Sequence, residues 1–161
     1  MDKVDVKILE MLEKNSRMPL NQLAAGVFLS SPATAARLER LEKEGIISGY
    51  GIRINHQKLG FPITAYINIA MHPSKKPIFY PFIEAHPNVI ECCCVTGHYS
   101  MIIKVAFQST EMLDAFIGQL QSFGNTETQI VFSTAKERGN VNISDIMAER
   151  YPALPDMEEE K

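Results

Sequence analysis

The sequence predicts an α+β protein of two small domains. In the first 45 residues, apolar side chains recur at helical spacing in three short segments. From about residue 63 onward, four segments rich in β-forming residues are interspersed with two helical ones. A change in composition at HQKLGFP, residues 56–62, separates the two regions and predicts a hinge. Of the 161 residues, 45% are apolar and 22% are charged, as is typical of globular domains.

Three short helices are expected before residue 46. Pro, Ser and Asn interrupt the helical period in NSRMP, residues 15–19, and in FLSSP, residues 28–32. Because the second break is so short, the second and third helices match the pattern of a helix-turn-helix. The segment IISGYGIRIN, residues 46–55, is rich in Ile and Gly and is expected to be a short strand or pair of strands, acting as a wing or linker.

The second region has the element order β-α-β-β-α-β. The expected strands are TAYINIAM at 64–71, VIECCCV at 89–95, MIIKVAF at 101–107 and QIVFSTA at 129–135. One helix is expected over 111–120, and another around 78–86, with its regular part starting close to Pro81 because proline disrupts a helix interior. With right-handed crossovers, this order gives a ferredoxin-like βαββαβ sandwich with both helices on one face. The bare face of the sheet is expected to be covered by a second copy.

The formal net charge of −3 is distributed unevenly along the chain. Basic residues exceed acidic residues by two in residues 1–60, whereas acidic residues are in excess by one in 61–140 and by four in 141–161. The overall balance argues against a generally polycationic nucleic-acid binder. The positive excess nevertheless coincides with the predicted helix-turn-helix.

The third predicted helix has one flank suited to contact with another molecule. Leu38 and Leu41 lie on the stripe that packs inward, and Glu39 and Glu42 lie on one side of it. The other flank combines basic side chains with small ones that allow a close approach of the backbone. Its members are Ala33, Ala36, Arg37 and Arg40.

The start of this helix is suited to phosphate binding. Ser30 or Ser31 can accept hydrogen bonds from the free N–H groups of the first turn, and Pro32 fits an early position where no donor is needed. A helix N-terminus also favours a bound phosphate. These features predict a helix placed end-first into the major groove of double-stranded DNA, with Arg17 and Gln22 as candidate phosphate contacts. A solvated helix face is the alternative, against which the helix-turn-helix context argues.

Short motifs in both regions resemble one protein family. In the first region they are IL at 8–9, Arg17, QLA at 22–24, LS at 29–30, Arg37, LEKEGII at 41–47 and GY at 49–50. In the second region they are KLG at 58–60, PNVIEC at 87–92 and VTGHYS at 95–100. Over about residues 1–138, this pattern resembles the Lrp/AsnC (feast/famine) transcriptional regulators.

The resemblance implies a winged-type helix-turn-helix domain, a hinge strand, and a sandwich domain that forms homodimers and assembles into octamers or similar rings. It also implies that a small effector, usually an amino acid, binds between sandwich domains and changes assembly or DNA affinity. By position, the resemblance assigns Thr96, Gly97, His98, Tyr99 and Ser100 to the effector loop. It also assigns Thr126 and Thr128 to a strand edge that completes the pocket, often from a neighbouring subunit.

Ser100 departs from the pattern of the family. The family commonly has Asp at this position, where an acid would hold the amino group of an amino acid. Serine keeps a hydrogen-bonding hydroxyl but lacks the charge, so the departure bears on effector affinity, effector class, or effector binding itself. A plain β-turn between two strands is the alternative interpretation of this loop.

The remaining motifs do not indicate catalysis. Cys92, Cys93 and Cys94 are adjacent in an expected strand, without CxxC spacing, and are expected to be buried apolar residues in a reducing cytoplasm. The sequence has no recognisable nucleophile-base motif or phosphate loop, so no enzyme, cofactor or metal site is expected. The charged N-terminus and the lack of a long apolar stretch predict a cytoplasmic protein without a membrane segment.

Together these observations predict a sequence-specific DNA-binding transcriptional regulator that responds to a small effector, an amino acid by resemblance. The expected domains are a helix-turn-helix domain at 1–50, a hinge strand or linker at 51–62, a ferredoxin-like effector-binding and oligomerisation domain at 63–138, and a partly mobile extension at 139–161. The rival is an effector-sensing oligomer whose helix-turn-helix does not bind specific DNA. An enzyme acting on an amino acid is a third alternative.

Overall fold

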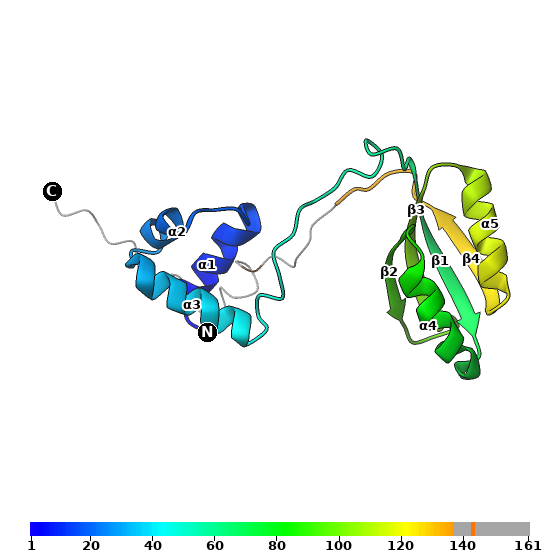
Figure 1. Cartoon of the computed structure of the whole chain (residues 1–161), viewed down its shortest axis with the longest axis horizontal. Helices are drawn as coiled ribbons and strands as arrows, with labels where there is room; N and C mark the ends of the chain where they lie inside the picture. The colour runs from blue at the N-terminus through cyan, green and yellow to red at the C-terminus, as the bar shows by residue number, and fades with distance from the viewer. Residues whose placement is uncertain (137–142, 144–161) are drawn as a thin grey trace. The chain divides into compact units, whose positions relative to one another are not determined.

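The computed structural model describes residues 1–136 and residue 143, and the described chain forms two compact units (Figure 1). The helical unit is Met1–Ile52 and the sandwich unit is Arg53–Ala135. The predicted extension at 139–161 lies outside the described residues, apart from residue 143. Within the described part of the chain, no helix is both long and apolar enough to cross a membrane.

Three helices make up the helical unit, as the apolar spacing predicts: α1 (Lys3–Lys14), α2 (Leu20–Gly26) and α3 (Ser31–Lys43). The Asp2 carboxylate accepts from the Asp5 N–H and caps α1, and the Ser30 hydroxyl accepts from the Ala33 N–H and caps α3. The buried centre of the unit joins all three helices through Ile8, Leu23, Val27 and Leu41.

The strand expected within residues 46–55 is absent from the structure, which describes this segment as non-regular chain. Ile52 and Ile54 are exposed there. A strand is stable only when its backbone groups pair with a neighbouring strand, and none of the strands that the structure describes pairs with the segment. The prediction of a strand at 46–55 is therefore wrong for the single chain, and the hinge expected at 51–62 contains turns at 56–60 instead.

The sandwich unit has the predicted ferredoxin-like topology. Its elements are β1 (Ile63–Met71), a 3-10 turn η1 (Pro73–Lys75), α4 (Lys76–Ala85), β2 (Val89–Cys94), β3 (Met101–Phe107), α5 (Thr110–Gln121) and β4 (Gly124–Ile130). All neighbouring strands are antiparallel in the order β2-β3-β1-β4, and α4 and α5 lie on the same face of the sheet (Figure 1). Between the helices and the sheet lies an apolar core that includes Ile67, Phe79, Ile103 and Phe116.

The opposite face of the sheet, called the open face below, carries no helix. It is formed by side chains that alternate with the buried ones along each strand. Its members include Tyr66, Asn68, Cys93, Ile102, Lys104, Glu127 and Gln129.

Two element boundaries differ from the prediction. The fourth strand runs from Gly124 to Ile130 and not over 129–135, because β4 begins almost directly after α5. A Cβ at Gly124 would lie 2.1 Å from the Ala70 carbonyl oxygen, so glycine allows the close approach of β4 to β1 that starts this strand. Helix α4 begins at Lys76 and contains Pro81 in its interior, so the prediction that it starts near Pro81 is wrong; Pro77 already supplies the favourable proline of the first turn.

The cysteines are only partly buried. Cys92 packs against the apolar core, as expected, and burial raises the pKa of its thiol to about 11. Cys93 and Cys94 are exposed, which corrects the expectation that all three are buried. The cause is the position of β2 at the edge of the sheet, where side chains have neighbours on one side only.

Candidate DNA-binding and effector-binding sites

The start of α3 presents a small, polar surface. Ser30, Pro32, Ala33 and Ala36 are exposed, and Ser31 is half-buried. The Ser30 hydroxyl is 3.3 Å from the Ala33 backbone nitrogen, and Pro32 occupies the first turn, as the sequence predicts. Because these side chains are short, another molecule can approach the backbone of α3 closely here.

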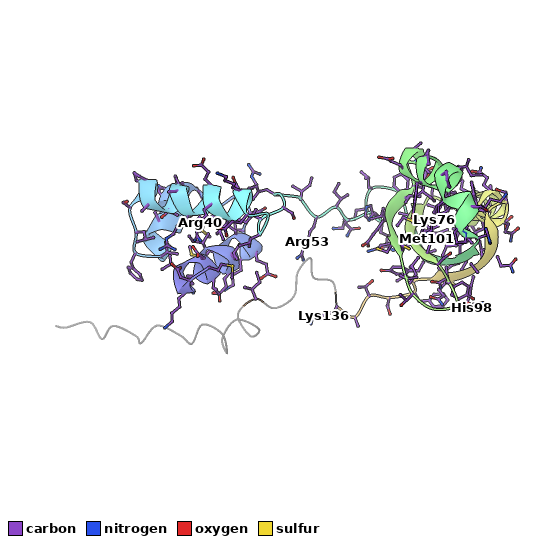
Figure 2. The ribbon with its side chains drawn as sticks, turned by 90° about the horizontal axis from the view of Figure 1, so that it is seen from below. Arg40, Arg53, Lys76, His98, Met101 and Lys136 are labelled. Carbon is purple, nitrogen blue, oxygen red and sulfur yellow. The ribbon has the colours of Figure 1, made fainter. Side chains whose placement is uncertain are left out.

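Arg37 and Arg40 point toward α1, and Figure 2 shows Arg40 on α3. Arg37 Nη1 lies 2.8 Å from Asp5 Oδ1 and 2.6 Å from Asp2 Oδ2. Arg40 Nη2 lies 2.6 Å from Asp5 Oδ2. The Asp5 carboxylate is fully buried, whereas the arginine side chains remain 28% and 40% exposed. Both guanidinium groups therefore bind a carboxylate of the same unit while keeping an accessible side.

The carboxylates of this cluster stay charged over the ordinary pH range. Burial alone would raise the pKa of Asp5, but hydrogen bonds from Arg40, from the Asp2 backbone and from Arg37 outweigh it, so the pKa lies below its usual value. The same balance, with Arg37 as the main hydrogen-bond donor, lowers the pKa of Asp2. Asp2 and Asp5 also form a reciprocal capping box at the start of α1.

Asp5 was not predicted from the sequence as a partner of the arginines. The available signal was an acid placed in the apolar stripe of the first helix, three residues before the buried Ile8. A charged residue at such a position is rarely buried without an opposite charge. The basic residue that pairs with it could not be predicted, because Arg37 and Arg40 are 32 and 35 residues away in the sequence.

Arg17 and Gln22 lie near the start of α2, and both are exposed. The Arg17 backbone N–H donates to Asn15, and the Gln22 backbone N–H donates to Asn21, so the local chain is fixed while the side chains are accessible. The helical unit therefore has two accessible polar side chains, Arg17 just before α2 and Gln22 within it, in addition to the short exposed side chains at the start of α3.

The loop between β2 and β3 carries the predicted effector residues, and His98 lies on it at the rim of the sandwich unit (Figure 2). Gly97 has φ +113°, a left-handed conformation that favours glycine. The Ser100 hydroxyl donates to the Ile69 carbonyl at 3.1 Å and accepts from the Met71 N–H at 3.0 Å. Ser100 thus anchors the loop to β1 through its side chain.

A hydrogen-bonded group on the open face joins this loop to β4. The Tyr99 hydroxyl donates to the Glu127 carboxylate, and Gln129 Nε2 donates to Glu127 Oε1 at 3.3 Å. The pKa of Glu127 is lowered mainly by the hydrogen bond from Tyr99 and to a smaller extent by the one from Gln129. The hydrogen bond between Tyr99 and Glu127 in turn raises the pKa of Tyr99. The ring of His98 meets that of Tyr99 edge-on, with centroids 4.8 Å apart. Glu127 is a polar residue of this group that the sequence analysis did not single out.

Thr126 and Thr128 lie on the other face of β4. They pair with Ile69 and Ile67, which are buried beneath the helices, whereas Glu127 pairs with Asn68 on the open face. Within one chain, the structure therefore brings Tyr99 together with Glu127 and not with the two threonines. Thr96 and Gly97 are exposed on the loop itself.

Comparisons with known proteins identify both units. A domain family described as "Winged helix-turn-helix DNA-binding" matches residues 1–48, and one described as "Lrp/AsnC ligand binding domain" matches residues 64–141. The HTH-type transcriptional regulator LrpA of Bacillus subtilis is 39% identical over 131 residues, which are 81% of this chain and 96% of that protein. This relative is named as a transcriptional regulator, which confirms the prediction of a regulator and not of an enzyme.

Solved structures agree in fold. LrpC of Bacillus subtilis matches with a TM-score of 0.81 and 28% identity, over 86% of this chain and 99% of that one. The transcriptional regulator NMB0573 of Neisseria meningitidis, solved as a complex with L-Met, matches with a TM-score of 0.84 over 91% of this chain and 99% of that one. Its identity of 22% shows a shared fold only. From the two domain matches and the extent of the similarity to LrpA, this chain belongs to the Lrp/AsnC family of helix-turn-helix transcriptional regulators.

Proposed function

We propose that this protein is a cytoplasmic regulator that binds specific DNA sequences through the start of α3. The observation that carries the proposal is the exposed surface of Ser30, Pro32, Ala33 and Ala36 at the start of the second helix of a helix-turn-helix. Short side chains let the helix enter a major groove, and the positive end of the helix dipole favours a phosphate there. Arg37 and Arg40 would contact DNA with the sides of their guanidinium groups that Asp2 and Asp5 leave accessible.

The internal ion pairs decide which variant tests this proposal. Replacing Arg37 by alanine would remove one of two cations that neutralise the buried Asp5, so a loss of DNA binding could simply report damage to the fold. Ala36 is a better position because it is exposed and makes no ion pair. An acid there would face the phosphates without disturbing the core.

The test is selection of genomic DNA fragments by the purified protein at near-physiological salt. We expect the wild type to enrich a small set of fragments and Ala36→Glu to enrich none, at unchanged thermal stability. Ala115→Glu is the matched control, because Ala115 is an exposed alanine on α5 of the sandwich unit. If the wild type enriched nothing, or if Ala36→Glu bound the same fragments as tightly, α3 would not be the DNA-binding element.

The loop at 96–100 is the proposed site of a small effector, an amino acid. The match of residues 64–141 to a ligand-binding domain supports this proposal, as does the L-Met complex of the structural neighbour. The Ser100 hydroxyl already holds two backbone groups of β1, so it offers less to a ligand than a free hydroxyl would. Tyr99, Glu127 and Gln129 are the polar groups available beside the loop on the open face.

Effector binding is tested by repeating the DNA selection with a pool of the twenty amino acids. A change in the enriched fragments or in affinity, lost in Glu127→Gln, would support a sensor that uses this group. Gln121→Glu, an exposed position at the end of α5, controls for a change of charge in the same unit. An unchanged selection would contradict the amino-acid proposal while leaving DNA binding intact.

A second candidate function is an effector-sensing oligomer whose helix-turn-helix does not bind specific DNA. The observation that favours it is the engagement of both Arg37 and Arg40 by carboxylates of α1. The salt dependence of DNA binding separates the candidates, because each phosphate contact releases counterions and steepens the fall of affinity with salt. Weak binding without a steep salt dependence would favour the oligomer.

A further inference from the structure

The turn between α2 and α3 requires a left-handed backbone at Phe28. The Phe28 N–H donates to the Ala25 carbonyl at 3.2 Å, and the Leu29 N–H donates to the Ala24 carbonyl at 3.0 Å. These two bonds close the end of α2 as a Schellman motif, with Val27 as its C-cap. The motif places the residue after the C-cap at positive φ, and Phe28 has φ +55°.

Phenylalanine is an unfavourable residue at this position. Glycine adopts positive φ without the steric cost that a Cβ brings. Among the described residues, Phe28 is the one residue other than glycine that has a positive φ. The residue is 95% exposed, so burial of the ring does not offset this cost. The apolar contact that usually accompanies the motif comes from the next residue, because Leu29 packs against the core of the helical unit.

The ring stands at the edge of the surface proposed for DNA. Phe28 precedes the cap of α3, Ser30, by two residues, and Ser30, Pro32 and Ala33 follow it as exposed members of that surface. The two neighbours of Phe28 in sequence add little exposed apolar surface to the ring, since Val27 is buried and Leu29 packs against the core of the helical unit. A protein interface needs a contiguous patch, whereas a DNA interface is polar and uses single apolar side chains against thymine methyl groups or sugars.

We infer that Phe28 is a DNA-contacting residue whose exposed ring packs against an apolar edge of the DNA beside the N-terminus of α3. This inference rests on the proposed DNA binding and adds a contact that is neither ionic nor made by α3 itself. Local strain at an exposed residue is a common cost of a functional side chain. The ring gains its packing only when DNA is bound.

Three variants of the full-length protein test the inference on a DNA fragment that the wild type selects. Phe28→Gly removes the ring and the strain, so we expect affinity to fall about tenfold while the thermal midpoint is unchanged or higher. Phe28→Tyr keeps an aromatic ring at the same backbone conformation and is expected to bind within about twofold of the wild type. Arg17→Ala serves as the comparison for a phosphate contact.

The salt dependence of affinity identifies the kind of contact. An apolar ring neutralises no phosphate, so Phe28→Gly should leave the slope of log affinity against log salt unchanged, whereas Arg17→Ala should reduce it by about one. Wild-type affinity in Phe28→Gly would overturn the inference, and so would a loss accompanied by a lower thermal midpoint or an altered slope. Failure of the wild type to select any fragment would instead overturn the proposed function.

Discussion

Asp5 links the start of one helix to the orientation of another. Its buried carboxylate belongs to the capping box of α1 and accepts from Arg37 and Arg40 of α3. A buried charge is tolerated only when opposite charges and hydrogen bonds compensate its loss of water. The same carboxylate therefore fixes two guanidinium groups at the edge of the proposed DNA-binding surface, so that less rotamer entropy is lost when they meet a phosphate.

Replacing Asp5 by asparagine should weaken the helical unit. The change removes the charge that both arginines share and replaces one of the two oxygens that accept from them with an NH2 donor, so we expect a loss of about 2 kcal/mol in the free energy of unfolding. Chemical denaturation followed by circular dichroism measures it. The control is Glu44→Gln, because Glu44 is an exposed partner of Arg40 at 3.7 Å and should contribute little. Equal stability of Asp5→Asn and wild type would contradict the role assigned to Asp5.

The contribution of Asp2 and Asp5 should also appear in the pH dependence of the free energy of unfolding. The folded-state pKa values of Asp2 and Asp5 lie below 3.8, the value expected in the unfolded chain. Their contribution is therefore fully present above pH 3.8 and is lost as the pH falls through the folded-state values. Between pH 5 and pH 2, we expect the wild type to lose stability more steeply than Asp5→Asn.

At the scale of secondary-structure elements, the close approach of β4 to β1 is set by one glycine. The Cβ position of Gly124 lies 2.1 Å from the Ala70 carbonyl oxygen and 3.1 Å from the Met71 Cα. Both contacts are with backbone, which cannot move aside without breaking the pairing of the two strands. The start of β4, and with it the position of Glu127 opposite Asn68, depends on this approach.

Gly124→Ala should therefore destabilise the sandwich unit by about 2–4 kcal/mol, because the added methyl group overpacks a backbone contact. Thermal unfolding of the purified protein measures the effect. Gly118→Ala is the matched control: Gly118 lies within α5, and beyond the neighbouring backbone of its own helix no described atom is within 4 Å of its Cβ position, so alanine should stabilise the helix by up to about 1 kcal/mol. Similar unfolding midpoints for the two variants would show that β4 can shift to accommodate the methyl group.

At the scale of the whole molecule, the open face of the sheet is a layer that no described helix covers. Its alternating side chains include Tyr66, which is 37% exposed, with the Lys104 ammonium 5.8 Å from its ring centroid. A sheet with one bare face in a small sandwich is commonly covered by a second copy. We propose that this face makes the homodimer contact, from which octamers or similar rings would be built.

Tyr66→Glu should convert the assembled protein to monomers. An acid at position 66 can pair with Lys104 in the monomer, but at a dimer contact it would bury charge. Light scattering coupled to size-exclusion chromatography gives the mass of each species. Tyr80→Glu is the control, since Tyr80 is an exposed tyrosine on α4, which covers the other face of the sheet. A wild type that elutes as a monomer, or a Tyr66→Glu variant that stays assembled, would exclude this contact.

The local features of the fold were predictable from the sequence alone. The three helices of the helical unit follow from apolar spacing, and the bounds of β3, Met101–Phe107, match the predicted segment. The roles of Ser30 and Pro32 at the start of α3 could also be predicted, because capping depends on residues close together in the sequence. The order of strands followed from the handedness of crossovers and not from any single residue.

Features that depend on contacts between distant residues were decided only by the tertiary structure. The helical period placed Arg37 and Arg40 on one flank of α3, but only the packing of α1 showed that Asp5 holds their guanidinium groups. The strand predicted at 46–55 did not form, since β propensity needs a paired neighbour. The sequence thus determined most of the elements, the cap of α3 and the family, because these depend on residues close together in the chain. Tertiary structure determined which charges meet and which faces stay open, because electrostatic and packing energies depend on distance in space.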